Sequence, residues 1–396
     1  MIIGARKAVK AGAYPPAPLI VQVVRQYPPV RGGLEDVVSS LSRELVKRGF
    51  RVRVVTLNRV FSDPTRVLPA YEVVDGVEVV RIHYHGSSRY PLAFSVFRHL
   101  SDADLVHVHG VDFFFDALAL GRFMHGAPMV ATTHGGFFHT RKYTAIKKVW
   151  FQTLTRLSAR AYSAIACCSA SDLALFKTVQ PQHSLLVENG VDTAKFMGAS
   201  SKSPVKRMIT IGRFSQNKRL DHLLGMMAAL VAKDPDWTLD IAGPASDLSF
   251  NDVQAMIDKK GLRQHVTLHG ALDNGALKAL MSQASLFASA SEYEGFGLVA
   301  VEAMSAGLLP VLNGNDAYLA LAGKHKAIRI ADFTDAAASA IAVVASYQHL
   351  CDNSTLCDEL SAATHSYSWE RVSQRYVDIY REVSGKRAAF SVFQAQ

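Results

Sequence analysis

One stretch in the second half of the sequence constrains the fold more than any other. Residues 284–290 form a short apolar run, glycines follow at Gly295 and Gly297, and residues 298–304 are good helix formers with no breaker before Gly307. This order predicts a buried strand, a glycine turn and a helix. The first turn of such a helix presents unpaired backbone N–H groups and a partial positive charge, so an anion can bind close to the backbone there.

Two carboxylates frame this turn. Glu294 lies just before the glycines, and Glu302 lies on the helix, about 7 Å along its axis from Gly297. An anion needs no carboxylate beside it, whereas the hydroxyls of a sugar or ribose donate hydrogen bonds to carboxylates. The stretch therefore predicts a site for a molecule with phosphates and hydroxyls, such as a nucleotide sugar. The predicted donor-binding residues here are Gly295, Phe296, Gly297, Leu298 and Glu302.

Two other interpretations of the same stretch remain open at this point. Gly295-x-Gly297-x-x-Ala300 also matches the dinucleotide fingerprint, with Asp316 about twenty residues further on, which would indicate an NAD-dependent oxidoreductase. The paired glutamates, and a position far from the first turn of a cofactor domain, argue against that. The glycines could also serve the turn alone.

The rest of the chain repeats strand–helix alternation. An apolar strand at 19–24, a turn with Gly32 and Gly33, a helix at 35–48 and a strand at 51–57 predict a β-α-β unit. Gly32 and Gly33 are candidates to approach a donor phosphate, with a simple tight turn as the alternative. Further strands are predicted at 77–83, 104–109, 129–133, 164–168, 185–188, 207–211, 237–242, 266–269, 286–289 and 309–312.

This alternation predicts an α/β protein with two Rossmann-like domains, each a doubly wound parallel sheet, facing across a cleft. The polar stretch 200–204 is the predicted linker. The expected organisation is a loose extension at 1–18, a first domain at 19–200, a second domain at 206–366, and a last helix within 367–396 that packs back toward the first domain.

Three further residues are predicted to lie at sheet edges where ligands bind. His134 follows a buried strand and precedes Gly135, which places it at such an edge. Arg213 and Lys218 flank a turn after the first strand of the second series, where fixed cations would neutralise a diphosphate. His107 is expected to be structural.

Positive charge is concentrated in the first half of the chain. Residues 1–200 carry 24 Lys and Arg against 14 Asp and Glu, a net charge of +10, and residues 201–396 carry 19 against 20, a net charge of −1. Basic residues precede an aromatic one in a segment that suits an anionic membrane surface or a lipid phosphate, namely Arg141, Lys142, Lys147, Lys148 and Trp150. An ordinary solvated helix face is the alternative. No nucleic-acid module accompanies the charge, so nucleic acid is not an expected partner.

The composition limits the remaining classes. No apolar run reaches the roughly 18 residues that a spanning helix needs. The four cysteines form no C-x-x-C pair, which suits reduced thiols. Two D-x-D matches, Asp102-Ala-Asp104 and Asp234-Pro-Asp236, precede predicted strands and are attributed to turns. With Arg213 and Lys218 supplying positive charge, neither a metal nor a cofactor is expected.

The combined motifs resemble those of the retaining glycosyltransferases of family 4, which have two facing Rossmann-like domains. The resemblance rests on the Glu294…Glu302 pair and on four further motifs in the family's order, Gly32-Gly33-Leu-Glu, His107-Val-His109, Asn189-Gly190-Val-Asp192 and Gly212-Arg213…Lys218. More closely, Ser87-Ser-Arg-Tyr-Pro91, Thr133-His-Gly-Gly-Phe-Phe-His-Thr140 and Trp150-Phe-Gln-Thr-Leu-Thr155 resemble the bacterial mannosyltransferases of acetan- and xanthan-type exopolysaccharide assembly.

The resemblance implies a donor, an acceptor and residue roles. It implies transfer of mannose from GDP-mannose to cellobiosyl-diphosphopolyprenol in an α-1,3 linkage, by a peripheral protein at the cytoplasmic face of the inner membrane. It implies catalytic roles for His134, Lys218, Glu294 and Glu302, and a site role for Ser169. A family-4 enzyme with another nucleotide sugar or lipid acceptor remains an alternative, as does an epimerase or hydrolase on the same fold.

Overall fold

The computed structural model describes residues 17–30, 32–88, 90–135 and 149–385. Contacts divide the chain into two compact units, each described here by itself. The first comprises residues 1–132, 145–165 and 376–396, and the second comprises residues 133–144 and 166–375. The domain boundaries expected from the sequence remain a prediction.

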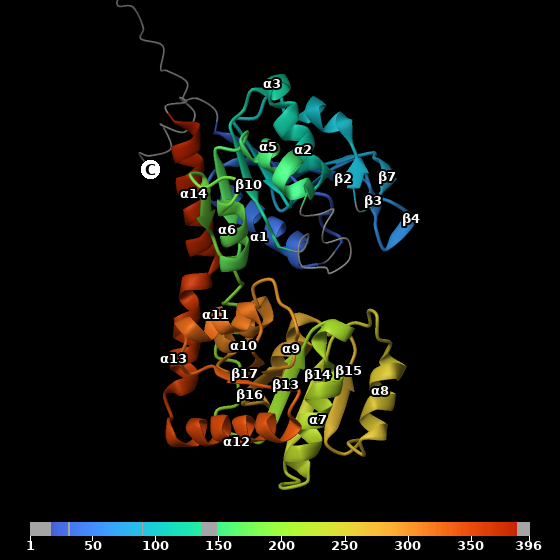
Figure 1. Cartoon of the computed structure of the whole chain (residues 1–396), viewed down its shortest axis with the longest axis vertical. Helices are drawn as coiled ribbons and strands as arrows, with labels where there is room; N and C mark the ends of the chain where they lie inside the picture. The colour runs from blue at the N-terminus through green and yellow to red at the C-terminus, as the bar shows by residue number, and fades with distance from the viewer. Residues whose placement is uncertain (1–16, 31, 89, 136–148, 386–396) are drawn as a thin grey trace, which may run out of the picture. The chain divides into compact units, whose positions relative to one another are not determined.

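An eight-stranded sheet is built mainly from the amino-terminal half of the chain. Its order is β12-β11-β10-β9-β1-β2-β6-β5, and β1 pairs in parallel with β2 and β9 on its two sides. Two of these strands, β10 and β2, are labelled in Figure 1. The strands are β1 Leu19–Val23, β2 Arg51–Leu57, β5 Tyr71–Val74, β6 Val77–Ile82, β9 Leu105–His109, β10 Met129–Thr132, β11 Ala164–Cys167 and β12 Ser184–Leu186. Several strands are buried along their whole length, as expected for a parallel sheet with both faces covered.

The helices around this sheet follow the apolar periodicity of the sequence. Helix α1 (Gly33–Lys47) buries one stripe that includes Val37, Leu41 and Leu45. Gly49, with φ 84°, turns the chain into β2. The other helical segments are η1 Phe94–His99, α2 Phe113–Leu120, α3 Arg122–His125, η2 Phe151–Thr155, α5 Arg156–Ala159 and α6 Ala170–Lys177.

Several short antiparallel pairings include strands that were not predicted, and of their members only β6 matches a predicted strand, the one at 77–83. They are β3 Arg59–Val60 with β4 Asp63–Val67, β5 with β6, and β7 His85–Ser87 with β8 Tyr90–Leu92. All five residues of β4 and all three of β7 are exposed. Without a buried face, such strands lack the apolar alternation that identifies a strand in the sequence.

The second sheet is parallel throughout and has the order β15-β14-β13-β16-β17-β18. Its strands are β13 Arg207–Ile211, β14 Thr238–Ala242, β15 Val266–His269, β16 Leu286–Ser289, β17 Leu309–Asn313 and β18 Arg329–Ala331. The strand order reverses between β13 and β16, so a crevice is expected beyond the carboxyl ends of these two strands. The expectation of two doubly wound parallel sheets is confirmed.

Helices on both faces complete the second unit. They are η3 Gln216–Lys218, α7 Leu220–Val231, α8 Phe250–Lys259, α9 Asn274–Met281, α10 Leu298–Ala306, α11 Asp316–Lys324, α12 Ala336–Asp352, α13 Leu356–Ala363 and η4 Thr364–Tyr367. Buried side chains such as Trp237, Phe287 and Met304 form a single core cluster. This core fixes the strand ends from which the candidate site projects.

The last helix, α14 (Trp369–Ser384), is anchored by polar bonds inside the first unit. His107 on β9 bonds the hydroxyl of Tyr380 at 2.7 Å through Nδ1 and that of Thr132 at 2.8 Å through Nε2. The Thr132 hydroxyl also lies 3.1 Å from the hydroxyl of Tyr376. His107 therefore has the structural environment expected for it, because a buried histidine needs such partners.

Candidate active site

The glycine turn and helix predicted around Gly297 are present. Gly297 caps α10 with φ 88°, and Gly307, also at φ 88°, ends the helix. A Cβ on Gly297 would lie 3.0 Å from the ring of Tyr318, so both the backbone conformation and the packing require glycine. Gly297 has no side chain that could bond the first amides of α10, which suits an anion at this helix end.

Lys218 and Glu294 meet at the end of the second sheet. Lys218 Nζ lies 2.6 Å from Glu294 Oε1, although the residues are 76 positions apart. Tyr318 donates its hydroxyl proton to the same oxygen at 3.2 Å, and burial, reinforced by the charge of Glu294, raises the pKa of Tyr318. Tyr318 therefore remains a donor at neutral pH. Sequence reasoning missed it, because nothing near Tyr318 in the chain marks it as a partner of Glu294.

Glycine at position 212 lets Lys218 lie across the end of β13. A Cβ on Gly212 would be 2.9 Å from Cε of Lys218. A Cβ on Gly243, at the end of β14, would be 1.9 Å from the carbonyl oxygen of Gly212. The two strand ends therefore need glycine to come this close.

Three asparagines hydrogen-bond to the backbone of the loop that carries Glu294. Asn217 donates to the Tyr293 carbonyl at 2.9 Å and accepts from the Tyr293 amide at 3.1 Å. Asn313 and Asn315 donate to the carbonyl of Ser291 at 3.2 and 2.9 Å. The sequence prediction did not include any of these asparagines.

Two other predicted donor residues lie in the same unit. Glu302 is on α10, and Lys195 Nζ lies 3.4 Å from its Oε1. Arg213 is exposed after β13. A backbone bond from Gln216 lowers the pKa of Asp247, and the charge of Arg213 adds to this effect.

The predicted site residue His134 lies in a strained turn held by Asp172. His134 and Gly135 both have left-handed backbones, with φ 54° and 67°. The buried Asp172 carboxylate accepts from the Thr133 hydroxyl at 2.5 Å and from the Gly135 amide at 3.1 Å, one residue to each side of His134. Burial lowers the pKa of His134 to about 4, against the opposing charge of Asp172. His134 is therefore neutral at pH 7.

Ser169 has a structural role at the start of α6. It caps α6 by accepting the Asp172 amide at 3.1 Å. The cap fixes the first turn of α6, and hence the carboxylate that holds the His134 turn. Asp172 was not singled out in the sequence, since its bonds to Thr133 and Gly135 span 39 and 37 positions.

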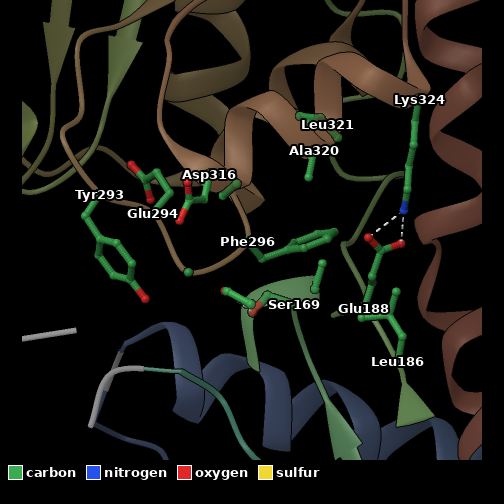
Figure 2. A pocket seen from close by; sticks show the side chains of 14 residues that line it. Ser169, Leu186, Glu188, Tyr293, Glu294, Phe296, Asp316, Ala320, Leu321 and Lys324 are labelled. Atoms are coloured by element: carbon green, nitrogen blue, oxygen red, sulfur yellow. Dashed lines mark hydrogen bonds and ion pairs between the residues drawn. The ribbon is translucent and has the colours of Figure 1, made fainter. Parts of the chain in front are cut away.

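A cavity of about 260 Å³ in the second unit collects four of the predicted residues, Ser169, Glu294, Gly295 and Phe296. In Figure 2, Phe296 lies in the middle of the lining, with Tyr293 and Glu294 on one side and an ion pair on the other. That pair joins Lys324 Nζ to both oxygens of Glu188 at 2.5 Å. The cavity is lined by Ser169, Ala170, Ser171, Leu186, Glu188, Tyr293, Glu294, Gly295, Phe296, Asp316, Ala317, Ala320, Leu321 and Lys324.

Of the remaining predicted residues, Leu298 begins α10 in the second unit, and the others belong to the first unit or lie outside the described residues. Gly32 is extended, with φ 179°, and Gly33 has no atom within 4 Å of the place where a Cβ would lie. Their proposed approach to a donor phosphate remains a prediction. Trp150 is partly exposed and packs edge-on against Tyr90, with ring centroids 5.9 Å apart. Arg141, Lys142, Lys147 and Lys148 lie outside the described residues.

The two D-x-D matches serve turns and ion pairs. Asp102 pairs with Arg53 at 2.7 Å, and Asp104 accepts the Leu19 amide at 2.8 Å. Asp234 and Asp236 both pair with Lys206, at 2.7 and 3.2 Å. Within the described ranges, no cluster of His, Cys, Asp and Glu side chains suited to a metal ion is found.

Family models match both halves of the chain. The model described as "Glycosyltransferase Family 4" matches residues 31–195, and "Glycosyl transferases group 1" matches residues 193–351. Solved structures share the fold. Sucrose-phosphate synthase from Thermosynechococcus elongatus has a TM-score of 0.70 at 18% identity, covering 92% of this chain and 99% of that one. Anabaena Alr3699/HepE in complex with UDP and glucose has a TM-score of 0.68 at 18% identity, covering 92% and 99%.

Two curated relatives are similar along almost their whole length. A GDP-mannose:cellobiosyl-diphosphopolyprenol alpha-mannosyltransferase of Xanthomonas oryzae pv. oryzae is 42% identical over 370 residues, which cover 92% of this chain and 97% of the relative. The protein of the same name from Komagataeibacter xylinus is 37% identical over 371 residues, covering 93% and 94%. These matches support a transferase and not the oxidoreductase alternative. The chain belongs to the family 4 glycosyltransferases.

Proposed function

We propose that this glycosyltransferase moves mannose from GDP-mannose to cellobiosyl-diphosphopolyprenol, with retention and an α-1,3 linkage, in exopolysaccharide assembly. The names of the relatives in Xanthomonas oryzae and Komagataeibacter xylinus support this donor and acceptor. The observation that carries the chemistry is the contact between Lys218 and Glu294 beside the amino end of α10. The cation suits the diphosphate of the donor and the carboxylate suits its sugar, and the bond between diphosphate and sugar is the one that breaks.

The diphosphate leaving group sets the electrostatic demand of the reaction. When the bond between C1 of mannose and the β-phosphate breaks, negative charge grows on the diphosphate. Lys218, Arg213 and the first amides of α10 would stabilise that charge, and fixed donors of this kind act most strongly where charge develops. Because these groups supply the positive charge, the proposed reaction requires no metal.

The two carboxylates of the site would bind the hydroxyl groups of the donor. Glu294 would orient the mannose hydroxyls or stabilise the positive charge that develops at C1, and Glu302 would accept hydrogen bonds from the ribose. The neutral His134 would contact the sugar or the accepting hydroxyl without adding charge to the site.

An enzyme with a lipid acceptor must reach that acceptor at a membrane surface. We propose that this protein binds peripherally to the cytoplasmic face of the inner membrane. No helix in the described ranges is long and apolar enough to span a bilayer. Around α3, Leu120, Phe123 and Met124 are 53%, 82% and 58% exposed, and Arg122 is exposed beside them. We call these four residues the α3 surface. Apolar side chains next to a cation suit an anionic interface.

Incubation of the purified protein with labelled GDP-mannose and cellobiosyl-diphosphopolyprenol, followed by linkage analysis, tests the proposal. The expected product is a lipid-linked trisaccharide with an α-1,3-mannose. Matched reactions with UDP-glucose and UDP-N-acetylglucosamine test the donor, and a reaction without lipid tests for hydrolysis. Transfer from a UDP-sugar alone, or equal consumption of GDP-mannose without the lipid, would refute the proposal.

A further inference from the structure

Three consecutive residues after β13 bond three consecutive residues before the glycine turn. Asn217 bonds Tyr293, Lys218 bonds Glu294 at 2.6 Å, and Arg219 bonds Glu292 at 2.9 Å. The first group belongs to the turn η3 and its end, and the second to the loop after β16. The lysine and the glutamate of the proposed mechanism thus form one of three contacts that join these two segments.

Asn217 differs from its neighbours because it bonds the backbone of the opposite segment. Its side chain donates to the Tyr293 carbonyl at 2.9 Å and accepts from the Tyr293 amide at 3.1 Å. Its own carbonyl accepts the Glu292 amide at 2.9 Å. These three bonds resemble a rung of a β-ladder and fix the main chain immediately before Glu294.

The other links cannot set the position of Glu294 as tightly. Glu292 is 63% exposed in its pair with Arg219, and exposed ion pairs hold weakly. Asn313 and Asn315 bond the Ser291 carbonyl, which is nearer the base of the loop. The Tyr318 hydroxyl bonds the carboxylate of Glu294, which does not fix the main chain of the loop.

The backbone next to Lys218 is strained, which is a second reason to expect that the surrounding bonds hold this turn in place. Arg219 has a left-handed backbone with φ 46°, directly after Lys218. A non-glycine residue in this region persists where the surrounding structure holds it. The bonds from Asn217 to residues 292 and 293 tie the turn that contains this conformation to the loop.

We propose that Asn217 is a positioning residue that holds Lys218 and Glu294 at their working separation. It touches neither donor nor acceptor, and acts by fixing the two main-chain segments. The proposal rests on the proposed function of that pair. A misplacement of about 1 Å in such a pair is enough to cost about a hundredfold in rate.

Substitution of Asn217 with alanine tests this. The Asn217→Ala variant is expected to lower kcat for mannose transfer about 10- to 100-fold and to leave the KM for the lipid acceptor within about twofold. Asn353→Ala is the matched control, since the side chain of Asn353 bonds its near neighbour Thr355. The control is expected to keep the wild-type rate. Wild-type kcat in Asn217→Ala would overturn the proposal.

A double-variant comparison separates positioning from general stabilisation. If Asn217 acts through the Lys218–Glu294 pair, its loss should cost less than about threefold in kcat once Lys218→Ala has removed the pair. An equal fold-loss in both backgrounds would mean that Asn217 acts elsewhere, and would contradict the proposal.

Hydrogen exchange provides a measurement that needs no substrate. In the free protein, amides of residues 291–297 are expected to exchange at least about tenfold faster in Asn217→Ala than in the wild type, and unchanged in Asn353→Ala. Unchanged exchange in Asn217→Ala would overturn the proposal even for an active enzyme. Failure of the wild type to use GDP-mannose would instead refute the proposed function, and the exchange result would still decide the role of Asn217.

Discussion

At the scale of single residues, the site depends on partners that lie far apart in the sequence. Lys218 and Glu294 could be chosen as candidate site residues from their motifs, but their direct contact could not be predicted, because 76 positions separate them. Asn217, Asp172 and Tyr318 were missed for the same reason. Each acts through bonds to distant segments, and local sequence carries no signal of those bonds.

Removal of either member of the central pair should reduce transfer strongly. We expect Lys218→Ala and Glu294→Gln each to lower kcat for mannose transfer by about 10²- to 10³-fold, the range seen when one preorganised electrostatic group is lost. Steady-state rates with saturating donor and lipid measure this. Glu292→Gln is the control, because the ion pair of Glu292 with Arg219 is exposed, and its kcat should stay within about threefold of the wild-type value. Near-normal rates in both pair variants would remove the basis of the mechanism.

His134 should make stability depend on pH. Its pKa is about 4 in the folded chain and about 6.5 when unfolded, so the unfolded state binds more protons between these values. Stability linked to His134 is therefore complete above about pH 6.5 and falls as the pH drops toward 4. We expect Tm to fall less between pH 6.5 and 4.5 in His134→Gln than in the wild type. Identical falls would contradict the low pKa of His134.

At the scale of elements, the sequence predicts the parallel strands well and the exposed ones poorly. The predicted strand at 19–24 is β1 Leu19–Val23, and those at 51–57 and 207–211 are β2 and β13 with the same bounds. Buried strands have apolar runs that identify them. Strands β4 and β7 do not, because their residues face solvent. The turn at Gly297 was predictable because helix formers directly follow the glycines.

Gly297 should tolerate no side chain. With φ 88° and the Tyr318 ring 3.0 Å from a Cβ, Gly297→Ala should destabilise the protein by about 1–2 kcal/mol and lower transfer. Gly323→Ala is the control, since it lies inside α11 with no atom within 4 Å of its Cβ position. Alanine there should be neutral or stabilising by up to about 1 kcal/mol. Chemical unfolding of both variants measures the difference, and equal stability would contradict the strain argument.

At the scale of the whole molecule, charge and exposed apolar side chains suggest where the lipid acceptor is met. The net charge of +10 over residues 1–200 contrasts with −1 over residues 201–396. The α3 surface lies in the positive half. The sequence directed attention to residues 141–150, and the exposure of Phe123 was not predictable, since apolar side chains near a helix end are usually buried.

Membrane binding should depend on charge and on the α3 surface. We expect the full chain to sediment with vesicles that contain anionic lipid, and to bind them less as salt rises from about 0.05 to 0.5 M. Phe123→Ser should weaken binding without changing transfer to a soluble acceptor analogue. The matched control is Val73→Ser, because Val73 is 58% exposed on β5. Equal binding by the wild type and Phe123→Ser would exclude this surface.

The most direct test of the account is a crystal structure of the protein grown with GDP. The account predicts that the β-phosphate lies within hydrogen-bond distance of Lys218 and of the first amides of α10, with Glu302 bonded to the ribose. GDP bound elsewhere, with Lys218 still paired to Glu294 and no phosphate at the end of α10, would contradict the central claim that these groups stabilise the leaving diphosphate.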